Sequence, residues 1–171
     1  SRLPLKREIE GGQGFLEDYA ALGLGFLALH QLSLDERWLA LAEALANSIL
    51  TLFSDGASPG FFQTARDSEQ LIVRRKESTD SVIPSGNSMA HFLLWRLGLV
   101  TGNEAWQKLA KDWLQSLGAD PGLYPTAFGQ TLQLLQEIER NPYELELQGP
   151  IESSFLQEIL SLLRRRYLPG L

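Results

Sequence analysis

The sequence contains no cysteine, and this absence removes several classes of site at once. Without thiols there is no disulfide framework, no thiol nucleophile and no cysteine-ligated metal centre. Histidine is nearly as scarce, because His30 and His91 are the only two, and this excludes a histidine-rich metal site. No spacing in the sequence resembles that of a Ser-His-Asp catalytic triad. We therefore expect no metal and no cofactor. The lack of cysteine also fits a reducing, cytoplasmic compartment.

An excess of positive charge and long apolar runs are missing as well. The 15 Lys and Arg residues against 21 Asp and Glu give a net charge of -6. This balance argues against nucleic acid or an anionic membrane as a partner, since both bind basic surfaces. No run reaches about 18 apolar residues, so no membrane span is predicted. The first residues lack the apolar h-region of a signal peptide, so none is predicted. The 171 residues, 44% of them apolar, are typical of a single globular domain.

Apolar periodicity predicts a mainly α fold, with helices over about residues 15–32, 36–53, 85–100, 104–117, 126–138 and 152–167. The first helix is apolar on nearly every side, which indicates a buried helix, and the second is apolar on one side, which indicates an outer helix. Strand-like composition at residues 61–64 and 71–74 predicts a small β-hairpin within residues 61–76. Alternation over residues 143–148 predicts a short, exposed strand near the C-terminus.

An internal repeat with an offset of 68 residues relates the first two helices to the next two. The offset pairs residues of like character: Phe26 with Leu94, Leu29 with Leu97, Asp35 with Asn103, Glu36 with Glu104, Trp38 with Trp106 and Ala42 with Ala110. Each unit is a buried helix, a polar turn with a capping residue and an amphipathic helix. This alternation favours a ring of helical hairpins, with a stacked helical solenoid as the alternative.

The most polar part of this scaffold is RRKESTDSVIPSGNSMAH, residues 74–91. At the repeat offset, Glu17 and Asp18 lie opposite Ser85 and Gly86, so both polar clusters fall at the N-terminal ends of buried helices. Parallel inner helices would bring these ends to one mouth of the ring. Free N–H groups there suit carboxylates, hydroxyls or anions, so we expect a ligand site at this mouth.

Three carboxylates are the candidate catalytic residues: Asp80, Glu17 and Asp18. A pair of carboxylates could supply the proton donor and acceptor for chemistry on a sugar. Adjacent residues point about 100° apart on a helix, so Glu17 and Asp18 cannot both face one substrate atom in the same way. The alternatives are that Glu17 and Asp18 complement the helix N-terminus and that Asp80 forms a turn.

The candidate substrate-binding residues are Arg74, Lys76, Ser85, Asn87, Ser88 and Tyr19. Arg74 and Lys76 are two apart and share one face of an extended segment, where they could bind hydroxyls or an anion, or pair with nearby acids. Ser85 is alternatively a helix cap, and Tyr19 a core residue. His91 lies one turn further along the third helix, where we favour a packed or surface histidine.

Several stretches together resemble one known family: GFLEDYA at residues 14–20, DERWLALAEAL, GFFQTARD at residues 60–67, R-x-K with PSGNS, and LRRRYLP. They resemble the YyaL-type family, whose mammalian member is a spermatogenesis-associated thioredoxin-like protein. That family carries a thioredoxin-like domain followed by an (α/α)6 toroid similar to the six-hairpin glycosidases and the sugar 2-epimerases. The resemblance implies that residues 1–171 form a C-terminal part of the toroid, without the thioredoxin-like domain. The chain reads Asp80-Ser81-Val82 where the family tends to read Asp-Gly-Ala.

Two functions follow from the residues and the resemblance. The first is a carbohydrate-active domain, glycosidase-like or epimerase-like, with a sugar-like small molecule at the inner-helix N-termini. A pocket that holds Glu17, Asp80, Lys76 and Asn87 together would favour it, whereas separation of these groups, or their exposure to bulk solvent, would favour the alternative that follows. The second is a non-catalytic helical module that binds a partner or supports a thioredoxin-like domain. Part of a toroid also leaves the flanks of its inner helices uncovered, so we expect self-association.

Overall fold

The computed structural model describes Leu5 and residues 14–54, 56–68, 73–140, 145, 147–150 and 152–165, except for the side chain of Arg164. These residues form two compact units, one ending at Leu134 and the other beginning at Leu135. The predicted mainly α fold is confirmed, because the described residues contain seven α-helices and no strand. The predicted single domain and its place in a toroid stay predictions.

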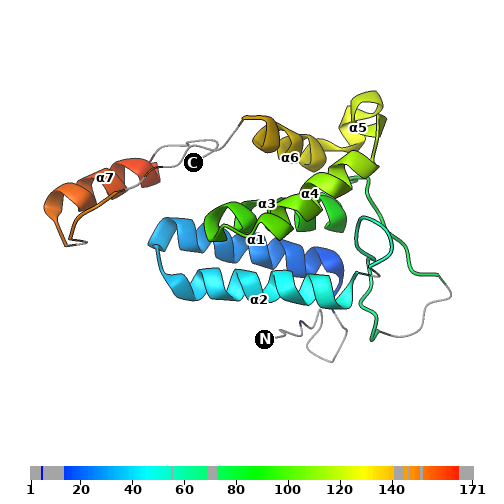
Figure 1. The fold of residues 1–171 in the computed structure, drawn as a ribbon, viewed down its shortest axis with the longest axis horizontal. Coiled ribbons are helices and arrows are strands. Elements are labelled where there is room, and N and C mark those ends of the chain that lie inside the picture. Colours follow the sequence, from blue (N-terminus) through cyan, green and yellow to red (C-terminus); the bar gives the residue numbers. More distant parts are fainter. Residues whose placement is uncertain are drawn as a thin grey trace. The chain divides into compact units, whose positions relative to one another are not determined.

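Two helical hairpins make up most of the first unit (Figure 1). Helices α1 (Leu16–Ser33) and α2 (Glu36–Leu52) form one, and α3 (Gly86–Thr101) and α4 (Glu104–Ser116) form the other. Within each hairpin the two helices pack together, and α1 also packs closely against α3. Helices α1 and α3 therefore join the hairpins. The prediction that the first helix is buried on nearly every side is wrong for the described residues, because Leu22, Leu29 and Leu32 are exposed.

The repeat is visible in how the amphipathic helices begin. The Asp35 carboxylate accepts a hydrogen bond from the Arg37 N–H at 3.0 Å, and the Asn103 side-chain oxygen accepts one from the Trp106 N–H at 3.2 Å. These N-caps satisfy backbone donors that have no partner within the first turn. Helices α2 and α4 begin one residue later, at Glu36 and Glu104, so the 68-residue offset holds in the structure.

The contact between α1 and α3 fixes their direction. A Cβ atom added to Gly86, the first residue of α3, would lie 3.0 Å from Leu16 Cγ, and one added to Gly23 would lie 2.5 Å from Leu93 Cδ2. The first contact joins the first residues of the two helices, and the second joins residues seven positions further along each helix, so α1 and α3 run parallel. Their N-termini meet, as predicted. The fully buried side chains between and beneath these helices include Leu16, Leu27, Leu45, Ile49, Leu93 and Leu97.

The predicted β-hairpin within residues 61–76 is wrong for the described part of that segment, and residues 69–72 lie outside it. One backbone hydrogen bond links the two sides, from the Gln63 N–H to the Arg75 carbonyl at 2.9 Å. Two neighbouring backbone groups bond elsewhere: the Phe62 N–H donates to the Phe53 carbonyl, and the Gln63 carbonyl accepts from the Leu16 N–H. These bonds use a donor and an acceptor that a regular strand ladder would need.

Short helices follow α4. They are α5 (Asp120–Leu123), the 3-10 helix η1 (Pro125–Ala127) and α6 (Gly129–Arg140), where the sequence predicted a loop and then one helix from residue 126. Helix α7 (Ser154–Arg165) lies in the second unit. The predicted strand at residues 143–148 is wrong for Leu145, Leu147 and Gln148, and its other residues lie outside the described ranges. None of the described helices is both long and apolar enough to cross a membrane.

Candidate functional site

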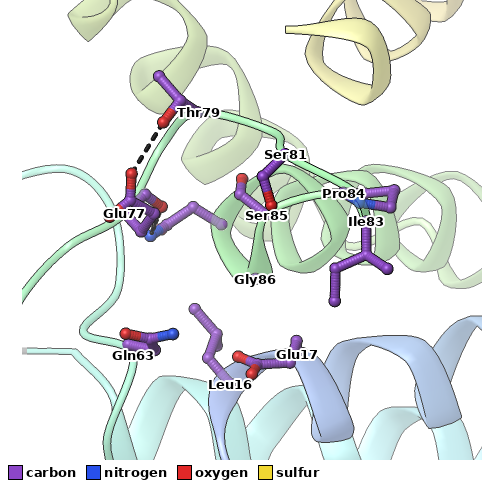
Figure 2. Close-up of a pocket in the computed structure, with 11 residues that line it drawn as sticks. Leu16, Glu17, Gln63, Glu77, Thr79, Ser81, Ile83, Pro84, Ser85 and Gly86 are labelled. Atoms are coloured by element: carbon purple, nitrogen blue, oxygen red, sulfur yellow. Dashed lines mark hydrogen bonds between the residues drawn. The ribbon is translucent and has the colours of Figure 1, made fainter. Parts of the chain in front are cut away.

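A pocket of about 150 Å³ opens where the N-terminal ends of α1 and α3 meet (Figure 2). Its walls come from the first turns of the two helices, from the loop that precedes α3 and from the segment after α2. The lining residues are Leu16, Glu17, Gln63, Glu77, Thr79, Ser81, Ile83, Pro84, Ser85, Gly86 and Asn87. The pocket therefore lies where the repeat predicts that the N-terminal ends of the two buried helices meet, and the ring around it stays a prediction.

Two carboxylates, several hydroxyls and one apolar wall give this pocket its chemistry. Glu17 comes from α1 and Glu77 from the loop before α3, and the Thr79 hydroxyl donates a hydrogen bond to Glu77 Oε1 at 2.8 Å (Figure 2). The described lining contains no cation, so hydroxyl or ammonium donors fit better than an anion. An engineered cavity of about 150 Å³ holds one benzene ring, whereas drug-sized ligands use about 300–1,000 Å³. The pocket therefore has room for one ring.

Asp80 does not line this pocket, because its carboxylate joins the starts of two helices. Oδ1 accepts hydrogen bonds from the Ser85 N–H and the Ser88 hydroxyl, both at 2.8 Å. Oδ2 accepts one from the Gln130 N–H in the first turn of α6, at 2.9 Å. The backbone N–H of Asp80 also donates to the Ala127 carbonyl at 2.8 Å. Both carboxylate oxygens are thus engaged in holding α3 and α6.

Asn87 lines the pocket, but its amide holds the wall rather than pointing a free group at a ligand. Its Oδ1 accepts from the Phe61 N–H at 2.6 Å, and its Nδ2 donates to the carbonyls of Phe61 and Glu77, each at 2.8 Å. The side chain is almost fully buried. Asn87 therefore fixes the backbone of Glu77 against the first turn of α3 and so positions a pocket carboxylate.

The two serines of the α3 start differ in position. Ser85 lines the pocket, and its Oγ accepts a hydrogen bond from the Ser88 N–H at 3.0 Å, so the helix-cap alternative for Ser85 is confirmed. Ser88 is fully buried behind the pocket and donates to Asp80. Of this pair, Ser85 is the one that a ligand can reach.

Arg74 and Lys76 share a face, as predicted, but that face is not the pocket wall. The Arg74 guanidinium carbon lies 4.0 Å from the centre of the Phe62 ring, and Lys76 Nζ lies 4.8 Å from the same centre. Arg74 also donates to the Thr64 carbonyl, and Lys76 donates to the carbonyl and hydroxyl of Ser58 at 3.1 and 2.8 Å. Both cations clamp the segment between α2 and α3.

The polar side chains at the start of α1 point in different directions, because successive residues of a helix are about 100° apart. Glu17 lines the pocket, whereas Asp18 Oδ2 accepts a hydrogen bond from the Phe15 N–H at 2.8 Å and closes the first turn. Tyr19 is buried, receives a hydrogen bond from the Leu5 N–H at 2.9 Å and packs edge-on against Phe53. Of these three residues, the structure places Glu17 alone at the pocket.

His91 is a packed residue. Its ring stacks between Phe61 and Trp113, with centroid distances of 4.8 and 4.3 Å, and its Nδ1 donates to the Asn87 carbonyl at 2.8 Å. Full burial lowers the pKa of His91 to about 3, so the ring is neutral near pH 7. The described residues bring together no cluster of three or more His, Asp or Glu side chains that could hold a metal ion.

Four polar pocket residues were not among the residues predicted from the sequence: Gln63, Glu77, Thr79 and Ser81. Three of them, Glu77, Thr79 and Ser81, could have been found from the two-residue period of an extended segment. Residues 73–81 follow this period in the structure, where they alternate between exposed and half-buried positions. Arg74, Lys76 and Asp80 take the half-buried positions. The same two-residue period that groups Arg74 with Lys76 puts Glu77, Thr79 and Ser81 on the opposite side, which is the pocket side.

No protein-family model matches this chain. The chain is similar to spermatogenesis-associated protein 20 from Mus musculus, Rattus norvegicus and Homo sapiens, at 27% identity over 158 residues in each case. That similarity covers 92% of this chain but 20% of each relative, so the chain spans about a fifth of their length. The chain is thus a distant homologue of one part of spermatogenesis-associated protein 20.

Proposed function

We propose that the pocket between the starts of α1 and α3 binds a single sugar-like ring, and that the chain forms the substrate-binding part of a carbohydrate-active domain. One observation carries this proposal: Glu17 and Glu77, from different elements, line the same small pocket together with hydroxyl and amide groups. Carboxylates are strong acceptors for ring hydroxyls. The apolar wall of Leu16, Ile83 and Pro84 offers a surface for the ring itself.

The same pair offers acid–base chemistry. Glycosidases place two carboxyl groups on either side of the reacting bond, and proton abstraction likewise needs a donor and an acceptor. Glu17 and Glu77 are the two carboxylates that line the space a ligand would enter. Asp80 has both oxygens bonded to neighbouring backbone and hydroxyl donors, so in this proposal it positions the α3 start.

The test is calorimetric titration of a monosaccharide panel into the chain, repeated with Glu17→Gln and Glu77→Gln. Glu104→Gln, at the exposed start of α4, is the matched control. A hydrogen bond to a charged group contributes about 1.5–3 kcal/mol, so each pocket variant should weaken binding by roughly tenfold to a hundredfold. Absence of binding up to about 10 mM sugar, or equal binding by all variants, would contradict the proposal.

A second candidate, a helical module that supports a thioredoxin-like domain, is favoured by the separation of the four groups: Glu17 and Asn87 line the pocket, whereas Asp80 and Lys76 do not. The polar side chains of Asp80, Asn87 and Ser88 are all engaged in hydrogen bonds within the chain, which suits a rigid support. Such a module would bind none of the sugars. It would show a raised Tm when mixed with a thioredoxin-like domain of the resembling family.

A further inference from the structure

The pocket between the starts of α1 and α3 is rich in hydrogen-bond acceptors. Its described lining contains two carboxylates, two side-chain amides and three hydroxyl groups, and their oxygens can all accept hydrogen bonds. In the view of Figure 2, Gln63 and Glu77 lie on one side of the opening and Ile83 lies on the other. A ligand that suits this lining has an apolar surface and a group that carries several donors.

The cations that lie closest to Glu77 in the sequence do not line the pocket. Arg74 and Lys76 donate hydrogen bonds to oxygens on the opposite side of their extended segment. Arg75 shares the exposed side of that segment with Glu77, but it does not belong to the pocket wall. The described lining therefore combines two negative side chains with no positive one.

Glu77 is held in place and can still accept hydrogen bonds from a ligand. The Asn87 amide donates to the Glu77 backbone carbonyl at 2.8 Å, and the Thr79 hydroxyl donates to Glu77 Oε1 at 2.8 Å. A carboxylate has about four lone-pair sites, so one hydroxyl donor leaves most of its capacity available. Because its backbone is fixed by Asn87, little ordering of the wall is needed when a ligand binds.

We infer that this pocket selects a cationic amino sugar, with the ammonium group against the Glu77 carboxylate. The inference rests on the proposed sugar-binding function and names its substrate class. A ring hydroxyl offers one donor, whereas an ammonium group offers three donors and a positive charge. Gln63 and Ser81 supply further side-chain oxygens in the same lining. A sugar acid is disfavoured, because its carboxylate would lie among side chains of the same charge.

The exposure of Glu77 sets the size of the preference. Glu77 is an exposed residue, so water and salt screen its charge. An exposed ion pair changes affinity by about two- to fivefold. We therefore expect an amino sugar to bind about two- to fivefold more tightly than the neutral sugar in which a hydroxyl replaces the ammonium group. Raising the salt concentration from about 0.02 M to about 0.5 M should bring this ratio toward one.

Competition titrations of glucosamine, glucose and glucuronic acid into the chain test this preference. Glu77→Gln should lower the affinity for glucosamine more than that for glucose, so that the ratio of the two falls to about one. Glu104→Gln, at the exposed start of α4, removes the same charge outside the pocket and should leave the ratio unchanged. This control separates the pocket carboxylate from the overall net charge of -6.

Ser81→Lys tests the charge argument without removing a pocket carboxylate. Ser81 lines the pocket and is exposed, so a lysine there adds a positive charge to the wall without being buried. The variant should reverse the preference and bind glucuronic acid more tightly than glucosamine. Gln115→Lys, at an exposed position of α4, adds the same charge outside the pocket and should keep the original preference.

The outcomes separate this inference from the function on which it rests. If glucose and glucosamine bind with equal affinity, the pocket is a sugar site without charge selection, and this inference alone is wrong. If none of the sugars binds, the proposed function is wrong and this inference with it. A preference for glucosamine that survives Glu77→Gln would overturn the assignment of the ammonium group to Glu77.

Discussion

Leu34 and Gly102 occupy equivalent places in the two repeats and share the same backbone conformation. Leu34 ends α1 at φ 58° and ψ 25°, and Gly102 ends α3 at φ 69° and ψ 17°. This left-handed conformation costs a leucine about 1–2 kcal/mol and glycine almost nothing. Leu34 is 47% exposed, so its side chain recovers little of that cost by packing. The first repeat is strained where the second is relaxed.

Leu34→Gly should therefore stabilise the chain. The expected gain is about 0.5–1 kcal/mol, because relief of the left-handed strain is partly offset by the greater freedom of glycine in the unfolded chain. Thermal unfolding should show a Tm higher by about 1–4 °C. The reverse change, Gly102→Leu, should lower the Tm by at least as much. A lower Tm for Leu34→Gly would show that the leucine side chain contributes packing that outweighs the strain.

The features that the sequence predicted well are local. Helix caps at Asp35 and Asn103 depend on residues two or three positions away, and apolar periodicity depends on a single helix. The repeat adds one longer relationship, and it predicted that the N-termini of α1 and α3 meet. These features predicted where the pocket lies and three of its polar residues, Glu17, Ser85 and Asn87.

The features that the sequence missed depend on partners far along the chain. The segment around Phe61 reads as a strand, but the Asn87 side chain occupies the Phe61 backbone groups from 26 residues away. Asp80 reads as a free loop carboxylate, but one of its oxygens binds the Gln130 N–H, 50 residues later. A local pattern contains no information about such partners, so the composition of residues 61–76 favoured a hairpin, and the sequence left Asp80 open between a catalytic and a turn-forming carboxylate.

Asp80→Asn should destabilise the fold. The carboxylate accepts hydrogen bonds from Ser85, Ser88 and Gln130, and an asparagine amide group would turn a donor toward one of those donors. We expect a loss of about 1–3 kcal/mol in the free energy of unfolding, measured by urea titration. Asp120→Asn, at the exposed start of α5, is the control and should change it by less than about 0.5 kcal/mol. Equal effects of the two changes would contradict a structural role for Asp80.

The burial of His91 predicts a loss of stability in mild acid. Its pKa is lowered to about 3 in the folded chain, against about 6.5 when unfolded, so between these values the unfolded chain binds one more proton. The contribution of the neutral His91 ring to the free energy of unfolding is complete above about pH 6.5 and is lost progressively as the pH falls toward 3. Between pH 7 and pH 5 the free energy of unfolding should fall by about 2 kcal/mol.

His91→Phe separates this effect from the titration of other groups. A phenyl ring can keep the stack between Phe61 and Trp113 but cannot take up a proton. Urea midpoints measured from pH 7 to pH 5 should therefore decline less in the variant than in the unmodified chain. Parallel declines in the two proteins would show that His91 does not cause the acid sensitivity.

Two helix glycines, Gly98 and Gly25, should respond in opposite directions to alanine. A Cβ on Gly98 would lie 2.9 Å from the Asn103 carbonyl oxygen and 2.7 Å from Gln107 Cγ, so α3 and α4 would have to separate. We expect a loss of about 1–3 kcal/mol for Gly98→Ala. Gly25→Ala meets open space, so the higher helix propensity of alanine should add about 0.4–1 kcal/mol. Thermal unfolding of both variants and of the unmodified chain measures these changes. Stabilisation by Gly98→Ala would show that the two hairpin helices pack less closely than their backbone contact indicates.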